Sequence, residues 1–280
     1  MSAPTGSTRL AAVIGSPVRH SLSPVLHNAA FAAAGLDWVY VALEVGPGRV
    51  PEALAGMRAL GIGGLSVTMP HKEAVAAECD RLSDDAAALG AVNCVVPDGD
   101  ELVGHNTDGA GFVAALAADG VDPAGMACVV LGAGGAARAI ALALARAGAA
   151  EVAVVNRTAA RAEQAVALLG GVGRVVAPAD AGESVGAAGL VVNATSVGMG
   201  DPAPSDLPLD PARLRAGQVV ADIVYRPLET ALLRAARTRG ATAVNGVPML
   251  VHQAAVAFEL WTGVPAPVAA MTASVARQLG

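Results

Sequence analysis

The sequence is poor in charged residues and has no cluster of lysine or arginine. Only 15% of its 280 residues are charged, and the formal net charge is -6. A nucleic-acid-binding surface needs a basic patch, so this composition argues against a nucleic-acid partner. Hydrophobic residues make up 54% of the chain, which provides for a sizeable core and argues against long disorder. We therefore predict a compact globular protein, and at this length two domains are the first expectation.

Cysteine and targeting signals are also scarce. The three cysteines, Cys79, Cys94 and Cys128, are widely spaced and form no Cys-x-x-Cys pair, which argues against a disulfide framework or a zinc knuckle. The five histidines show no metal-ligand spacing, so no metal is expected. The N-terminus lacks a basic region followed by an apolar core, and the uncharged stretch 241–258 is interrupted by polar residues. The sequence thus predicts a cytoplasmic protein with no membrane partner.

Short apolar runs rich in β-branched residues alternate with Ala/Leu-rich segments of helical length. Strands are expected at 9–15, 38–45 and 63–69, and a hairpin at 93–106, whose turn contains Pro97 to Asp100. The alternation restarts with strands expected at 127–131, 151–155, 174–177, 189–193 and 219–223, and another within 241–246. Parallel strands need crossover connections, so this rhythm predicts an α/β fold of mainly parallel sheets, the first of them mixed because of its hairpin.

A glycine-rich turn follows the strand expected at 127–131. Gly132, Gly134 and Ala137 match the pattern G-x-G-x-x-G/A directly before an Ala-rich helix. In this pattern the first glycine permits a tight turn, the second lets the backbone approach a pyrophosphate, and the small third residue lets helix and strand pack closely. A turn without a ligand is the alternative in an Ala/Gly-rich chain, but the strand and helix around the motif favour dinucleotide binding.

The next strand ends without the acid that NAD-binding units use to hold the ribose hydroxyls. Asn156, Arg157 and Thr158 stand there instead, and Arg161 lies one helical turn further on. A carboxylate would repel a 2′-phosphate, whereas the planar guanidinium of Arg157 matches phosphate oxygens. An ordinary solvated arginine at a strand end is the alternative. The charge at this position favours NADP(H) over NAD(H).

Polar residues gather where the predicted strands of the first half end. They are Ser21, Ser23, Thr68, Lys72, Asn93 and Asp108. Ligands of doubly wound folds bind beyond the carboxyl ends of the strands, so these side chains could face one cleft. Taken singly, Ser23 before Pro24 also suits a helix N-cap, Asp108 suits another, and a lone lysine is usually a surface residue.

Nine motifs follow one another through the chain, from residue 15 to residue 253: GSPVRHSLSPVLHN, SVTMPHK, GAVN, NTDGAG, GAGGAARA, NRT, NATSVGM, DIVYRP and GVPMLVHQ. Their order resembles that of the shikimate dehydrogenase family over nearly the whole chain. The resemblance implies an N-terminal mixed, mainly parallel α/β substrate domain at 1–107, completed by C-terminal helices at 247–280, and a Rossmann-like NADP-binding domain at 108–246. It also implies reversible NADPH-dependent reduction of 3-dehydroshikimate to shikimate, in the pathway to aromatic amino acids.

The resemblance further implies roles for residues at matching positions. Lys72 and Asp108 would be the catalytic pair. The substrate-binding set would be Ser21, Ser23 and Tyr225 at the carboxylate, with Thr68, Asn93 and Gln253 at the ring hydroxyls. The cofactor-binding set would be Gly132, Ala133, Gly134, Gly135 and Ala136 at the pyrophosphate, Asn156, Arg157, Thr158 and Arg161 at the 2′-phosphate side, and Ile223 and Gly246 at the nicotinamide side. An ammonium beside the carbonyl suits this reaction, because it stabilises the negative charge that grows on oxygen and can supply a proton.

Two residues depart from the family pattern. Ser66 stands where relatives commonly have Asn, and Cys94 where they commonly have Thr. Both side chains remain small, so the departures bear on fine substrate preference more than on reaction type. Two rival functions are a relative that accepts quinate or NAD, and a non-catalytic metabolite sensor; the missing strand-end acid counts against NAD, and the catalytic pair counts against a sensor. A monomer or a homodimer is expected.

Overall fold

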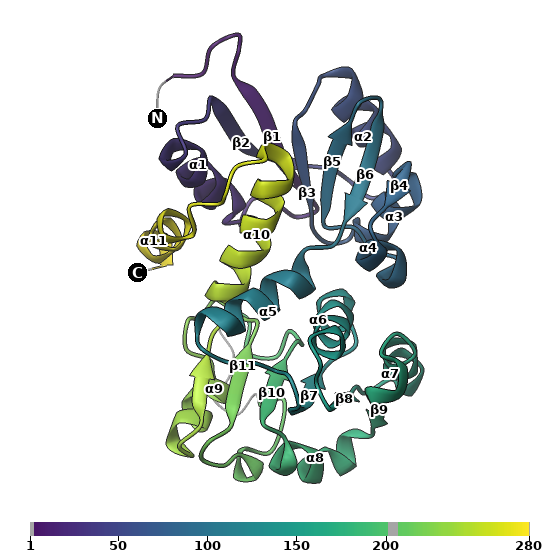
Figure 1. The fold of residues 1–280 in the computed structure, drawn as a ribbon, viewed down its shortest axis with the longest axis vertical. Helices are drawn as coiled ribbons and strands as arrows, with labels where there is room; N and C mark the ends of the chain where they lie inside the picture. Colours follow the sequence, from purple (N-terminus) through teal and green to yellow (C-terminus); the bar gives the residue numbers. More distant parts are fainter. Residues whose placement is uncertain (1–2, 201–206, 280) are drawn as a thin grey trace. The chain divides into compact units, whose positions relative to one another are not determined.

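A computed structural model of the chain describes residues 3–200 and 207–279. The chain divides into two compact units: Met1–Thr107 with Val251–Gly280 form the first, and Asp108–Leu250 the second. Each unit contains a six-stranded sheet and its helices, which confirms the predicted α/β fold class (Figure 1). Within the described residues, no helix is long and apolar enough to cross a membrane.

The first sheet is mixed, with the strand order β2-β1-β3-β5-β6-β4. Its strands are β1 (Arg9–Gly15), β2 (Trp38–Glu44), β3 (Gly64–Val67), β4 (Arg81–Leu82), β5 (Cys94–Asp98) and β6 (Glu101–His105). Strand β1 pairs in parallel with β2 and β3, whereas β5 runs antiparallel to β3 and β6. The predicted hairpin is therefore what makes the sheet mixed. Strand β4 escaped the sequence analysis because two residues are too short for an alternating pattern.

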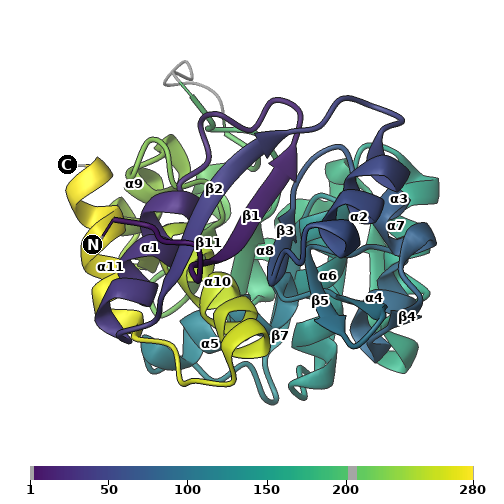
Figure 2. The ribbon, with the colours of Figure 1, turned by 90° about the horizontal axis from the view of Figure 1, so that it is seen from above.

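Residues from both ends of the chain share the core of the first unit. Its helices are α1 (Ser23–Ala33), α2 (Val50–Ala59), α3 (Lys72–Glu78), α4 (Asp84–Leu89), α11 (Val268–Leu279) and the greater part of α10 (Val247–Thr262). Helix α1 packs against β2 and α11 (Figure 2). The indole of Trp261, in α10, lies over Gly64, where an added Cβ would come within 2.5 Å of the ring. Its Nε1 donates to the Val95 carbonyl at 3.1 Å, so this large side chain joins α10 to two strands.

The second sheet is parallel throughout, with the strand order β12-β11-β10-β7-β8-β9. Its strands are β7 (Ala127–Leu131), β8 (Glu151–Val155), β9 (Gly173–Val176), β10 (Leu190–Asn193), β11 (Val219–Asp222) and β12 (Thr242–Val244). The central strands are almost wholly buried, as expected for a parallel sheet covered by helices on both faces. This arrangement confirms the predicted Rossmann-like sheet.

The helices of the second unit are α5 (Asp108–Ala118), α6 (Gly135–Arg146), α7 (Ala159–Val166), α8 (Ala181–Ala187) and α9 (Ala231–Thr238). Helices α5 and α6 lie in close contact at Gly109, where an added Cβ would be 2.6 Å from the Ala139 carbonyl oxygen. A larger residue there would push α5 away from α6. The start of α5 is thereby fixed against the helix that follows the glycine-rich turn.

Candidate active site

The loop after β1 brings Ser21 and Ser23 together. The Ser21 hydroxyl donates to Ser23 Oγ at 3.2 Å and accepts from the Ser23 backbone N–H at the same distance. Helix α1 begins at Ser23 itself, and Leu22 is the N-cap residue. The predicted N-cap role of Ser23 is therefore wrong, because its hydroxyl lies in the first turn. Backbone N–H groups without helical partners point out of such a turn and favour an anion.

Thr68 and Lys72 lie after β3 and at the start of α3. The Thr68 N–H donates to the Ile14 carbonyl at 2.9 Å. The Thr68 methyl lies only 2.4 Å from where a Cβ on Gly15 would stand, so glycine at the end of β1 makes room for it. Lys72 is the only lysine in the sequence. Its carbonyl accepts from the Val92 N–H at 2.9 Å, which holds the start of α3 against the segment before β5.

Asn93 is a buried polar side chain of this region, with 5% of its surface exposed. Its Nδ2 donates to Thr107 Oγ1 at 3.0 Å, and its Oδ1 accepts from the Thr107 N–H at 2.8 Å. The Asn93 carbonyl accepts from the Val67 N–H at 2.8 Å. The backbone thus brings Thr68, Lys72 and Asn93 to one end of the first sheet. Sequence analysis missed Thr107, whose position in the NTDGAG motif was the one available signal.

The remaining predicted substrate and catalytic residues lie on three other elements. Gln253 belongs to α10, within the first unit. Asp108 belongs to the second unit, where it is the first residue of α5 and 7% exposed. Its predicted N-cap role is therefore wrong by one position. Tyr225, also in the second unit, follows β11; burial raises the pKa of its phenol, and Arg226 acts in the opposite direction.

The glycine-rich turn of the second unit has the conformation that its sequence predicts. Gly132 has a φ of 109°, in the region that favours glycine, and an added Cβ would lie 2.9 Å from the Ala194 carbonyl oxygen. Gly134 is the N-cap of α6, and a Cβ there or on Gly135 would meet no described atom within 4 Å. The backbone is thus open to a pyrophosphate at a helix N-terminus, and the residues present fit a dinucleotide.

The end of β8 offers two guanidinium groups to solvent. Arg157 and Arg161 are both exposed, and no described carboxylate forms an ion pair with either. Asn156 Nδ2 donates to the Thr158 carbonyl at 2.9 Å, which bends the chain between β8 and α7. Two cations and no acid at this position suit a 2′-phosphate.

Asp222, at the end of β11, is a buried carboxylate that the sequence analysis did not single out. Its Oδ1 accepts from Asn193 Nδ2 at 3.0 Å and from the Val224 N–H at 3.1 Å, and its Oδ2 accepts from Thr230 Oγ1 at 2.7 Å. Desolvation raises the pKa of this carboxyl, and the three hydrogen bonds partly offset the rise. The network fixes the backbone that carries Ile223, the residue predicted to lie beside the nicotinamide.

Gly246 lies directly against the same backbone. An added Cβ would come within 2.1 Å of the Ile223 carbonyl oxygen, and the Gly246 N–H donates to the Val224 carbonyl at 3.1 Å. The predicted nicotinamide-side residues, Ile223 and Gly246, are therefore in contact, although they are far apart in the sequence. A side chain at position 246 would displace the loop that follows β11, at Ile223 and Val224.

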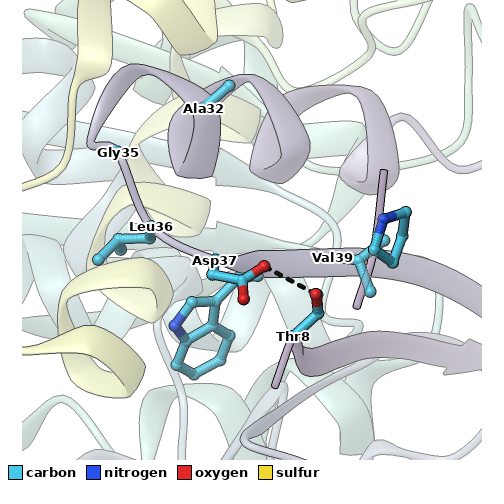
Figure 3. Close-up of a pocket in the computed structure, with 8 residues that line it drawn as sticks. Thr8, Ala32, Gly35, Leu36, Asp37 and Val39 are labelled. Carbon is cyan, nitrogen blue, oxygen red and sulfur yellow. Dashed lines mark hydrogen bonds between the residues drawn. The ribbon is translucent and has the colours of Figure 1, made fainter. Parts of the chain in front are cut away.

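A separate pocket of about 440 Å³ lies at the edge strand β2 of the first unit (Figure 3). Asp37, in its wall, accepts hydrogen bonds from the hydroxyls of Thr8 at 2.7 Å and Ser7 at 3.1 Å. The wall also contains Leu36 and Trp38. As far as the chain is described, none of the predicted site residues lines this pocket. Its one carboxylate is occupied in joining the N-terminal segment to β2.

Comparisons with known proteins place the chain in a family. Residues 13–95 match the shikimate dehydrogenase substrate binding domain, residues 115–199 match shikimate / quinate 5-dehydrogenase, and residues 246–276 match the shikimate 5'-dehydrogenase C-terminal domain. The shikimate dehydrogenase (NADP(+)) of Moorella thermoacetica is 50% identical over 281 aligned residues, which cover 98% of this chain and 95% of the relative. The chain belongs to the shikimate dehydrogenase family.

Solved shikimate dehydrogenases share the fold of the chain along nearly its whole length. One, in complex with NADP+, has a TM-score of 0.93 and 35% sequence identity, with 99% of this chain and 98% of the other covered. The Thermus thermophilus enzyme, in complex with NADP(H) and shikimate, has a TM-score of 0.89 and 40% identity, with 96% and 99% covered. The predicted family and the predicted pair of α/β domains are both confirmed.

The two departures from the shikimate dehydrogenase pattern are neighbours in space. Ser66 of β3 pairs with Cys94 of β5 across the antiparallel part of the first sheet. Paired residues place their side chains on the same face of a sheet, so Ser66 and Cys94 face the same side. Cys94 is fully buried, whereas Ser66 is partly exposed. The two departures therefore lie side by side in the sheet, next to Asn93.

Proposed function

We infer that the chain catalyses the reversible, NADPH-dependent reduction of 3-dehydroshikimate to shikimate, in the pathway to aromatic amino acids. The observation that carries this inference is its 50% identity, over nearly the full length, to a shikimate dehydrogenase that uses NADP(+). The local structure supports it in both units. The first unit gathers a lysine, an amide and hydroxyls at one end of its sheet, and the second carries a glycine turn followed by two exposed arginines.

Each unit has its own task in this proposal. Residues 1–107 and the C-terminal helices bind the substrate, and residues 108–246 bind NADP(H). The bound cofactor supplies the hydride. Gly132, Ala133, Gly134, Gly135 and Ala136 hold its pyrophosphate, Asn156, Arg157, Thr158 and Arg161 its 2′-phosphate, and Ile223 and Gly246 its nicotinamide side.

The substrate is a polyhydroxylated ring with a carboxylate remote from the reacting carbon. Ser21 and Ser23 bind the carboxylate, because their hydroxyls lie together at the first turn of α1. Tyr225 assists in binding the carboxylate. Thr68, Asn93 and Gln253 bind the ring hydroxyls. The Asn93 amide is held by Thr107, so its donor and acceptor are oriented before the substrate arrives.

Lys72 and Asp108 form the catalytic pair of the proposal. As hydride reaches the carbonyl carbon, negative charge develops on oxygen, and the Lys72 ammonium stabilises that charge and supplies a proton. Asp108 orients the ammonium and favours its charged form. Lys72 is the one lysine of the sequence, and all the other basic residues are arginine or histidine. Its presence at this motif position supports a chemical role for the amine.

The direct test is a steady-state assay of the purified protein with 3-dehydroshikimate, followed by the loss of NADPH absorbance. We expect turnover with NADPH and much weaker turnover with NADH. The matched control is Lys72→Ala, which should lose turnover while it still binds NADPH. No oxidation of NADPH by the wild type would refute the proposal.

A broader substrate range is the second candidate, because the profile matched by residues 115–199 covers both shikimate and quinate enzymes. Assays that pair shikimate or quinate with NADP or NAD separate the two. A preference for NAD would refute the role proposed for Arg157. A non-catalytic metabolite sensor predicts binding of shikimate without turnover in any pairing. A cytoplasmic location and a monomeric or homodimeric state complete the proposal.

A further inference from the structure

Tyr40, in β2, presents a polar group that the proposed function does not use. The residue is 2% exposed. Among the described residues, two buried side-chain polar atoms lack a hydrogen-bond partner, and the Tyr40 hydroxyl is one of them. Buried polar groups are nearly always hydrogen-bonded, so an unpaired phenol calls for an explanation. Phenylalanine would fill the same space without this cost.

The sheet register places the phenol on the same face as the two departures from the family pattern. Tyr40 pairs with Ala11 and Ala11 with Gly64, so all three side-chain positions share one face. Ser66, two residues after Gly64, lies on that face as well, and it pairs with Cys94. The small side chain of Ala11 leaves room for the Tyr40 ring on that face, and the Trp261 indole covers Gly64.

The ring of Tyr40 is held in place from α1 and α10. It stacks on His27 with centroids 4.4 Å apart, and the Trp261 ring is 6.0 Å away. Burial lowers the pKa of His27 to about 3, so the stacking partner is neutral. His27 lies one helical turn after Ser23, on the same face of α1. The phenol hydroxyl is therefore fixed in position beside residues of the proposed substrate site.

Two serine hydroxyls lie near the Tyr40 hydroxyl. Burial raises the pKa of the phenol, and the nearby hydroxyls of Ser66 and Ser23 act in the opposite direction. Both serines are partly exposed, and Ser23 Oγ already accepts from Ser21. Among the described residues the Ser66 hydroxyl makes no hydrogen bond, so Ser66 is the serine that remains available to the phenol. Its side chain is shorter than the Asn common at this position, so it has no second polar atom of its own.

We propose that Tyr40 is a positioning residue for the substrate, which acts through Ser66. With the substrate bound, the Tyr40 phenol donates a hydrogen bond to Ser66 Oγ. The Ser66 hydroxyl in turn donates to a hydroxyl oxygen of the substrate ring. A serine hydroxyl carries one proton. When its oxygen accepts a hydrogen bond from another group, that proton is directed to a different acceptor. The inference rests on the proposed function, because the ring hydroxyls belong to shikimate or its ketone.

The test is the isosteric variant Tyr40→Phe, assayed in both directions of the reaction. We expect KM for shikimate to rise about 2- to 10-fold, the range for one lost hydrogen bond. The value of kcat should change less than about twofold, because the contact is the same in ground and transition states. KM for NADP should not change. The matched control is Thr8→Val, which removes the hydroxyl that Thr8 donates to Asp37 at the edge of β2, and should leave every constant unchanged.

A double-mutant cycle distinguishes positioning through Ser66 from a general effect on packing. Ser66→Ala should raise KM for shikimate as Tyr40→Phe does, and the double variant should be no worse than Ser66→Ala. In Ser66→Asn, which carries its own donor and acceptor, the effect of Tyr40→Phe should disappear. Additive effects in the cycle would overturn the proposal. So would an unchanged KM in Ser66→Ala, which decides the matter even if Tyr40→Phe folds poorly.

The failure of this inference and the failure of the proposed function give different results. Wild-type protein that does not turn over shikimate refutes both. Active wild type with an equally active Tyr40→Phe variant refutes only the role of Tyr40, and the phenol is then an unpaired group whose removal leaves the Tm equal or higher.

Discussion

Replacing Asp222 by alanine should destabilise the second unit more than any conservative change at the same position. The carboxylate is 1% exposed and accepts hydrogen bonds from Asn193, Val224 and Thr230. Alanine leaves these three buried donors unpaired, at about 1–3 kcal/mol each. Relief of the desolvated charge offsets part of the sum. We therefore expect a net loss of about 2–4 kcal/mol in the free energy of unfolding.

The matched control is Asp222→Asn, which keeps the shape and one oxygen. That oxygen can serve Asn193 and Val224, and the new amide can donate to the Thr230 hydroxyl, which retains its own bond from the Leu233 N–H. The expected loss is below about 1 kcal/mol, the worth of one altered hydrogen bond. Both values come from urea unfolding curves of the variants. Alanine and asparagine variants of equal stability would refute the assigned network.

The Asp222→Ala substitution should also weaken cofactor binding. Val224 follows Ile223, the residue proposed to lie at the nicotinamide, and its N–H is one of the three donors. Loss of the carboxylate frees this backbone, so Asp222→Ala should raise KM for NADPH while KM for 3-dehydroshikimate changes less. Steady-state kinetics at saturating concentration of the second substrate measures each value. An unchanged KM for NADPH would show that the network serves stability alone.

Four other outcomes are expected. Lys72→Ala should lower kcat by a factor of about 10² to 10⁴ with a smaller change in KM, and an unchanged kcat would remove the amine from the mechanism. Amine-directed acylation should inactivate the protein, and shikimate with NADP should protect it, because Lys72 is the only lysine; mass spectrometry locates the modification. Arg157→Ala should raise KM for NADP and leave KM for NAD unchanged, and an equal effect on both cofactors would contradict a 2′-phosphate contact. The pKa of Asp222 is raised in the folded state, so the folded protein holds its proton more tightly than the unfolded chain does. The free energy of unfolding of the wild type should therefore fall relative to that of Asp222→Asn as pH rises from about 4, the ordinary aspartate range. Wild-type and Asp222→Asn stabilities that change in parallel with pH would exclude this linkage.

The sequence by itself determined the family, the fold class and the kind of cofactor. These depend on patterns that are local in the chain. The strand at Ala127–Leu131, the turn at Gly132 and the helix at Gly135–Arg146 follow from β-branched runs, glycine spacing and alanine content within one stretch. The positive charge of Arg157, which favours NADP(H), is likewise given by a single residue of the sequence. Local reasoning failed at the helix starts of Ser23 and Asp108, where a shift of one residue separates a cap from a first turn.

Only the tertiary structure decided which polar groups hold the site in shape. Thr107 fixes Asn93, Asp222 joins the end of β11 to the end of β10 and to the start of α9, and the sheet register places Tyr40 on the same face as Ser66 and Cys94. The partners in each case are distant in sequence, and the register of a sheet or the packing of a helix brings them together. A sequence motif shows which residue types a site contains. A buried hydrogen bond forms only when folding has excluded water and brought the donor and the acceptor within bonding distance.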